Sequence, residues 1–206
     1  MLEIKKISKS IKEKEIVSNI SFDVKAGDIF GLLGPNGAGK TTTFYMIAGL
    51  VHADNGKIIL ADKDISNTPM HQRSNLGIKY LPQEPSIFQN LSVYENLYGL
   101  AELSLDNKKD IRNFIDSSME EFNLSGISNL KGRQLSGGQR RKVEIARTLA
   151  AEPKIILLDE PFAGIDPIAI EDIKNVLKKL LKKNIGILIT DHNVRETLEI
   201  CTKAAI

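Results

Sequence analysis

Residues 34–41, Gly34-Pro35-Asn36-Gly37-Ala38-Gly39-Lys40-Thr41, have the residue types and the spacing of a phosphate-binding loop, G-x-x-x-x-G-K-[ST]. In this pattern backbone N–H groups surround the phosphates of a nucleotide, and the lysine reaches the terminal phosphates. The loop therefore predicts a site for a nucleoside triphosphate, without indicating what the bound nucleotide is used for.

A second motif, Leu135-Ser136-Gly137-Gly138-Gln139, also suits a phosphate. Ser136 and Gln139 have the spacing of a capping box, which predicts a helix over 137–151. A capping box does not account for the two glycines, because each costs up to ~1 kcal/mol relative to alanine inside a helix. Bare backbone at a helix N-terminus suits close contact with a phosphate. The motif therefore predicts both a helix cap and a phosphate contact.

An acidic pair, Asp159 and Glu160, ends an apolar stretch and could serve a metal-dependent hydrolysis. Two adjacent acids near a metal can divide the work, one neutralising the ion and the other orienting and deprotonating water. The alternative is that the pair caps the following helix, and Pro161 directly after it makes this less favoured. We expect Asp159 and the Thr41 hydroxyl to support Mg²⁺, and Glu160 to act on the water.

The elements that must position these residues are short apolar runs, typical of parallel strands that are buried on both faces. Polar or glycine-rich residues follow each run, so the suspected chemistry collects at the carboxyl ends of the strands, where open α/β sheets bind ligands. Gln83 and His192 stand at two such ends. The runs are 29–33, 78–81, 155–158 and 185–189.

Other segments predict antiparallel strands near the N-terminus and a group of helices in the middle of the chain. The antiparallel strands are expected around residues 2–7, 20–24 and 58–60, and helices over 40–48, 93–102, 108–122, 137–151 and 168–183, with Pro167 at the start of the last. The predicted fold is α/β, a single domain over 1–206. Its α/β core covers 1–82 and 152–206, with the N-terminal antiparallel β portion, and a helical subdomain over 83–151 is inserted.

Composition narrows the functional classes. The 206 residues are 42% apolar and 26% charged with a formal charge of +2, which fits a globular chain and argues against an extended nucleic-acid surface. The single cysteine excludes an intrachain disulfide. No apolar stretch approaches the roughly 18 residues that suggest a membrane span, and residues 1–6 lack the apolar core of a signal peptide.

Together the two glycine-rich motifs and the acidic pair resemble the nucleotide-binding subunit of an ABC transporter. The resemblance implies an ATPase that binds ATP and Mg²⁺, with Glu160, His192 and Gln83 as catalytic residues and Thr41, Gln83 and Asp159 at the metal. It also implies a homodimer in the ATP-bound state, in which Ser136 and Gly138 contact the γ-phosphate held by the other subunit. The implied nucleotide-binding residues are Gly34, Pro35, Asn36, Gly37, Ala38, Gly39, Lys40, Thr41, Thr42, Ser136, Gly137, Gly138, Gln139 and Asp159.

Segments 42–47, 80–88 and 190–198 look most like the ATPase subunit of the bacterial lipopolysaccharide-export system. This implies polytopic membrane subunits as partners, and a peripheral location on the cytoplasmic face of the inner membrane, or in the cytoplasm when the subunit is free. Two alternatives stay open: an ATPase of branched-chain amino-acid uptake, which is less similar after His192, and a soluble ABC ATPase without a transport role. Asp166 is either the N-cap of the next helix or, by the resemblance, a residue that communicates across the dimer.

The chain departs from the family pattern at Ile11, where an aromatic residue usually stacks on adenine, and at Gln89, where a basic residue is usual. It also ends at Ile206, before the final strands and glycine turn that such ATPases normally carry after the last helix. Phe88, with Tyr94 beside it, is predicted to form the wall of a groove for a short helix of each membrane subunit. Val93 and Leu97 share a helix face and are predicted to pack inward.

Overall fold

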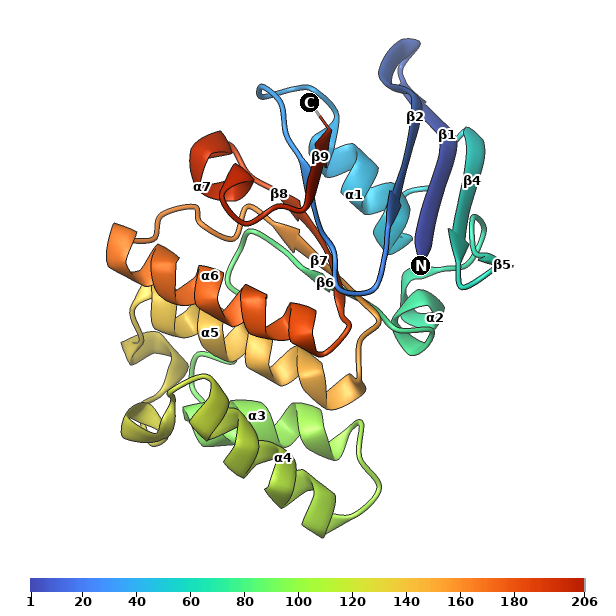
Figure 1. The fold of residues 1–206 in the computed structure, drawn as a ribbon. Helices are drawn as coiled ribbons and strands as arrows, with labels where there is room; N and C mark the ends of the chain where they lie inside the picture. Colours follow the sequence, from blue (N-terminus) through green and yellow to red (C-terminus); the bar gives the residue numbers. More distant parts are fainter. Residues whose placement is uncertain (206) are drawn as a thin grey trace. The chain divides into compact units, whose positions relative to one another are not determined.

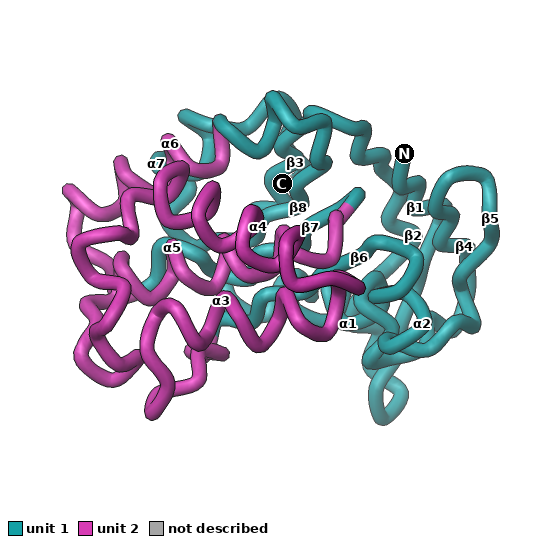
Figure 2. Tube along the Cα trace, turned by 90° about the horizontal axis from the view of Figure 1, so that it is seen from below, with its two compact units in different colours: residues 1–83, 154–163, 179–206 teal, residues 84–153, 164–178 magenta. Residues whose placement is uncertain are grey.

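The computed structural model describes residues 1–205, which form two compact units (Figures 1 and 2). Unit 1 comprises residues 1–83, 154–163 and 179–206, and unit 2 comprises residues 84–153 and 164–178. Unit 1 contains both β-sheets, whereas unit 2 is built from helices and the loops between them. Within residues 1–205, every helix is too short or too polar to cross a lipid bilayer.

A five-stranded parallel sheet carries the suspected chemistry in unit 1. Its order is β6-β7-β8-β3-β9, and every residue of β7 and β8 is buried, including the polar Asp159 and Thr190 at their carboxyl ends. The four apolar runs of the sequence form β3, β6, β7 and β8, which confirms that prediction. The expectation that the chain ends before the final strands is wrong for β9, which follows the last helix and pairs with β3. The bounds are β3 Ile29–Leu32, β6 Ile78–Leu81, β7 Ile155–Asp159, β8 Gly186–Thr190 and β9 Lys203–Ala205.

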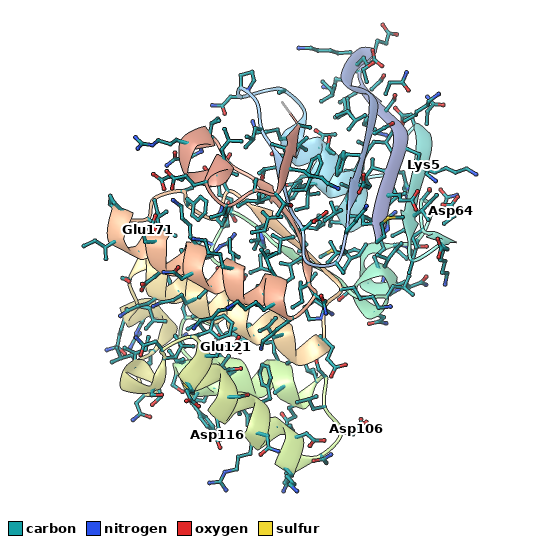
Figure 3. All side chains as sticks on the ribbon, viewed as in Figure 1. Lys5, Asp64, Asp106, Asp116, Glu121 and Glu171 are labelled. Atoms are coloured by element: carbon teal, nitrogen blue, oxygen red, sulfur yellow. The ribbon has the colours of Figure 1, made fainter. Side chains whose placement is uncertain are left out.

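A four-stranded antiparallel sheet with the order β2-β1-β4-β5 forms the other β portion of unit 1, as predicted. Lys5 and Asp64, labelled in Figure 3, are exposed on this sheet. The helix α1 (Lys40–Ala48) contacts β2 of this sheet and β6 and β7 of the parallel sheet, so the phosphate-loop helix is anchored by a core shared between both. The bounds are β1 Leu2–Ile11, β2 Lys14–Val24, β4 Asn55–Leu60 and β5 Lys63–Asp64.

A buried arginine fixes the end of α1. Arg73, on the six-residue helix α2 (Met70–Asn75), is 1% exposed, and its guanidinium donates to the carbonyl oxygens of Met46 at 2.7 Å and Ile47 at 2.8 Å. These carbonyls lie in the last turn of α1, where the helix leaves acceptors without intrahelical donors. No pattern in the sequence predicted α2, which is held through this side chain.

Capping boxes begin two of the helices in unit 2. The box at Ser136 was predicted and the box at Ser92 was not, and Val93 and Leu97 are fully buried, as predicted. The predicted helix over 137–151 is an α-helix only to Thr148 and ends in a 3-10 turn, Leu149–Ala151. The α-helices of this unit are α3 Val93–Glu102, α4 Lys108–Glu121 and α5 Gly137–Thr148, and α6 Pro167–Lys182 begins here and ends in unit 1.

Candidate nucleotide-binding and hydrolytic site

The phosphate-binding loop joins β3 to α1 in the conformation that its glycines allow. Gly37 and Gly39 have φ values of 82° and 84°, in the left-handed region. A Cβ on Gly39 would lie 2.6 Å from the Ile16 carbonyl oxygen, so this position has no room for a side chain. Gly39 is also the N-cap of α1, and because it offers no side-chain cap, the first N–H groups of the helix are available to an anion.

Lys40 has its amine at the same loop. The side chain is 8% exposed, and Nζ donates to the carbonyl oxygens of Gly34 at 2.8 Å and Pro35 at 2.9 Å. Both are weak neutral acceptors, and a phosphate oxygen would make a stronger charge-assisted bond with the amine. The bare backbone at Gly39 and the lysine therefore fit the phosphates of a nucleotide.

A cavity of about 460 Å³ lies along this loop. One part of its wall comes from the β1–β2 hairpin and another from the phosphate-binding loop and the start of α1. Glu160, from the end of β7, completes the lining, so the cavity brings the predicted phosphate contacts to the predicted base. The lining residues are Ile11, Lys14, Ile16, Asn36, Gly37, Gly39, Lys40, Thr41, Thr42 and Glu160.

Asp159 is buried at the end of β7 and held by two hydroxyl groups. Thr190 Oγ1 donates to Oδ1 at 2.6 Å, and Tyr80 Oη donates to Oδ2 at 3.2 Å. Burial, and then the negative charge of Asp159, raise the pKa of Tyr80 well above its ordinary value, so the phenol stays a hydrogen-bond donor. The oxygens of Asp159 and of the Thr41 hydroxyl are of the kind that Mg²⁺ prefers.

Glu160 and His192 come together at the ends of neighbouring strands. Glu160 Oε2 lies 3.3 Å from His192 Nδ1, and the two side chains are 20% and 57% exposed. The backbone N–H of Glu160 donates to the Thr190 carbonyl at 2.9 Å, which ties the acidic pair to β8. The structure thus places the predicted base beside the predicted γ-phosphate contact. Gln83 is exposed after β6 and is not among the described residues that line the cavity, so its role stays a prediction.

The second motif lies in unit 2 at the N-terminus of α5. Ser136 Oγ accepts from Gln139 N at 3.2 Å, and Gln139 Oε1 accepts from Ser136 N at 3.0 Å, which confirms the predicted capping box. A Cβ on Gly138 would lie only 2.4 Å from the Ala169 Cβ, whereas one on Gly137 would meet its nearest neighbour at 3.6 Å. The approach of α6 therefore explains Gly138, and only Gly137 lacks a packing reason within its own unit.

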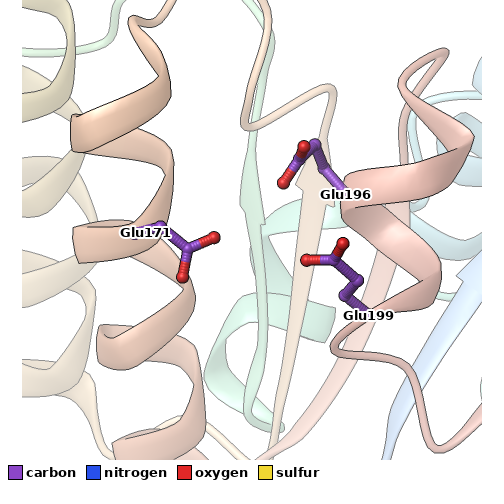
Figure 4. Close-up of side chains that lie close together, drawn as sticks. All are labelled: Glu171, Glu196 and Glu199. Carbon is purple, nitrogen blue, oxygen red and sulfur yellow. The ribbon is translucent and has the colours of Figure 1, made fainter.

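Other polar groups near these motifs have structural partners. Asp166 Oδ1 accepts from Ala169 N at 2.9 Å, as expected of an N-cap for α6. Figure 4 shows Glu171 of α6 in unit 2, together with Glu196 and Glu199 of unit 1, from the short helix α7 (Val194–Leu198) and its C-cap. Glu171 pairs with Lys174 at 2.9 Å and Glu199 with Arg195 at 3.7 Å, and we assign no ion to these carboxylates.

Three residues that support the site carried no predicted role. Tyr80 and Thr190 hold Asp159, and the fully buried Asp191 accepts hydrogen bonds from the backbone of two loops. Thr190 and Asp191 do directly follow an apolar run, so their position at the sheet edge was visible in the sequence. Their partners depend on which strand lies next to β8, and no local pattern indicates this.

Comparisons with known proteins agree with this geometry. The model of a family described as ABC transporter matches residues 17–163. The lipopolysaccharide export system ATP-binding protein LptB of Haemophilus influenzae is 55% identical over 207 residues, covering 100% of this chain and 86% of the relative. The predicted fold class, a P-loop NTPase core of the ABC ATPase type, is confirmed by the solved structures that the chain resembles.

Two such structures bear on the nucleotide. One is the ADP conformation of MJ1267, an ATP-binding cassette of an ABC transporter, with a TM-score of 0.86 and 31% identity over 98% of this chain and 84% of that one. The other is a dimeric post-hydrolysis state of the cassette MJ0796 bound to ADP and Pi, with a TM-score of 0.79 and 25% identity over 96% of this chain and 90% of that one.

Proposed function

The chain belongs to the ABC transporter family, and we propose that it is the ATP-hydrolysing subunit that energises lipopolysaccharide export from a bacterial inner membrane. The observation that carries the hydrolytic part is the position of Glu160, in the wall of the cavity that the phosphate-binding loop lines and 3.3 Å from His192. The export substrate is supported by the 55% identity that extends over the whole chain.

The residues divide the work of hydrolysis as follows. Lys40 exchanges its two carbonyl acceptors for the β- and γ-phosphates of ATP. Gly34 and residues 36–39, with Thr42, donate backbone N–H groups to the phosphates, while Pro35, which has no N–H, shapes the loop. Thr41, Asp159 and Gln83 would hold Mg²⁺, which would neutralise phosphate charge. Glu160 accepts a proton from the attacking water at its carboxylate, and His192 contacts the γ-phosphate beside it.

We also propose that two copies act together in the ATP-bound state. Ser136, Gly137, Gly138 and Gln139 would contact the γ-phosphate of the nucleotide held by the second copy, through the N-terminus of α5. The exposed position of Ser136 and the dimeric cassette among the similar structures support this arrangement. In this proposal the chain is one ABC ATPase domain in which residues 83–151 are the helical subdomain.

The partners in this proposal are polytopic membrane subunits, which would hold the chain at the cytoplasmic face of the inner membrane. Unit 2 exposes apolar side chains between α3 and the loops beside it: Phe88 is 49%, Leu91 38% and Tyr94 44% exposed. Arg147 lies with its guanidinium carbon 5.3 Å from the centre of the Phe88 ring and fixes one face of that ring. The exposed apolar surface of Phe88, Leu91 and Tyr94 suits an apolar helix of the partner.

Recovery of the full chain from membranes, with its partners identified and ATPase activity measured, tests the proposal. Two polytopic subunits and ATP-dependent release of lipopolysaccharide from vesicles are the expected result. Co-purification with amino-acid uptake subunits, or with a soluble complex only, would replace the export assignment and leave the ATPase assignment intact. A full chain that binds ATP with Mg²⁺ but never hydrolyses it, with or without partners, would remove the ATPase assignment.

A further inference from the structure

We propose that Asp191 is a positioning residue that sets the catalytic geometry of Glu160 and His192, an inference that rests on the proposed ATPase function. Asp191 follows β8 and is completely buried, with no exposed surface. A buried carboxylate is costly unless its oxygens accept hydrogen bonds. Here each oxygen accepts from a different loop, so one side chain joins the two segments that carry the hydrolytic residues.

The first oxygen holds the loop after β7. Phe162 N donates to Asp191 Oδ2 at 3.1 Å, two residues beyond Glu160. Residues 160–163 form a tight turn, in which Ala163 N donates to the Glu160 carbonyl at 3.2 Å. Pro161 has no N–H, so the bond from Phe162 is the link between the middle of this turn and β8.

The second oxygen holds the loop that carries His192. Asn193 N donates to Asp191 Oδ1 at 2.8 Å, which closes an Asx turn around His192. Val194 N donates to the His192 carbonyl at 3.0 Å, so the backbone of the histidine is held on both sides before α7 begins. The same carboxylate therefore holds both the turn that follows Glu160 and the turn that contains His192.

The backbone of Glu160 requires such support. Its φ is 43°, in the left-handed region that a non-glycine residue adopts only when its surroundings hold it there. Glu160 N donates to Thr190 O on one side of this strained residue, and the bond between Phe162 and Asp191 restrains the other side. Loss of the second restraint would allow Glu160 to relax, and its carboxylate would move away from His192.

The substitution Asp191→Asn tests this role with little change in volume. An amide has one acceptor oxygen, so one of the two backbone N–H groups must face the amide NH₂, a second donor. We expect kcat to fall about 10- to 100-fold, the size of effect that a misplacement near 1 Å can have, while the affinity for ATP stays within about twofold. The control Asn107→Ala removes the N-cap of α4, which accepts from Asp110 N at 2.9 Å, and should lower stability with unchanged kcat.

A double-mutant cycle with Glu160→Gln separates positioning from general stability. Because Asp191 acts partly through Glu160, Asp191→Asn should cost less activity in the Glu160→Gln background than in the original chain, measured as ATP consumed in single-turnover reactions over hours. Losses that multiply in the double variant, or a kcat within twofold of the original in the single variant, would overturn the inference. If Asp191→Asn fails to fold, Asp191→Ser, which also keeps one acceptor oxygen, takes its place in the cycle.

Two measurements on the unchanged chain separate failure of this inference from failure of the proposed function. Amide hydrogen exchange should show Phe162 and Asn193 protected, and exchange at the rate of an unprotected amide would remove the bridge itself. A chain that does not hydrolyse ATP would remove the proposed function and this inference together. A chain that hydrolyses ATP and tolerates Asp191→Asn would remove only the inference.

Discussion

The substitution Ile11→Tyr should tighten ATP binding selectively, because Ile11 stands in the cavity wall where an aromatic side chain could stack on adenine. Ile11 ends β1 and pairs with Lys14 of β2 across a two-residue turn, in which Lys12 and Glu13 have φ values of 49° and 64°. It is 49% exposed and lines the cavity together with Lys14 and Ile16. The hairpin thus offers the base an aliphatic surface and an amine.

The size of the effect follows from what isoleucine already supplies. Stacking of a base on an aromatic side chain is worth about 1–3 kcal/mol. Isoleucine keeps part of the apolar contact, so the gain from tyrosine should be about 1 kcal/mol, or roughly fivefold in affinity. The half-exposed position leaves space for the larger ring without displacing core residues.

Dissociation constants for ATP and for inorganic triphosphate, measured on the same preparations by calorimetry, give the test. The ATP constant should fall about fivefold, and the triphosphate constant should not change, because triphosphate has no base. Ser10→Tyr is the matched control: Ser10 precedes Ile11 on the same strand, points to the opposite face and does not line the cavity. Equal tightening of both ligands, no tightening, or the same gain from Ser10→Tyr would refute the reasoning.

Three further predictions concern the proposed base, the phosphate-binding loop and the docking surface. Glu160→Gln should keep ATP binding, lower turnover about 10²- to 10⁴-fold and accumulate the ATP-bound dimer, and near-normal turnover in an ATPase assay would remove Glu160 as the base. Gly39→Ala should weaken ATP binding about tenfold or more, because its Cβ meets the Ile16 carbonyl; Gly37→Ala, with φ 82° and no atom within 4 Å of a Cβ, should cost less. Phe88→Ala should leave ATP binding intact but weaken assembly with the membrane subunits by about 2 kcal/mol, measured by co-purification; normal assembly would place the docking surface elsewhere.

Elements with a strong internal pattern could be predicted from the sequence. The apolar runs of β7 and β8 and the capping box of α5 contain their own signals, and the structure confirms all three predictions. The short elements α2 and β9 could not be predicted in this way. The sequence of α2, MHQRSN, has no apolar face, and β9 has three residues, two of them alanine. Their positions come from contacts with distant residues, Arg73 on the end of α1 and β9 on β3.

The candidate site could likewise be predicted only in part from the sequence. Motif spacing was enough to name Lys40, Asp159 and Glu160 and to place His192 at the edge of the sheet. It also attributed both glycines of the second motif to a phosphate, whereas the nearby Ala169 gives Gly138 a packing reason. That reason was not visible, because it depends on the distance between two helices rather than on either helix alone.

The register between β7 and β8 brings the residues at the ends of these two strands together. Asp159 pairs with Thr190, so the Thr190 hydroxyl reaches Asp159 and the next residue, Asp191, reaches the N–H of Phe162. A shift of one residue would reverse the faces on which Thr190 and Asp191 project and would separate both from their partners. The residues proposed to perform the chemistry are therefore recognisable one motif at a time, but their mutual placement is a property of the paired strands. This is why a residue such as Asp191, with no motif of its own, can accept hydrogen bonds from the loops that carry two residues singled out by their position at the sheet edge.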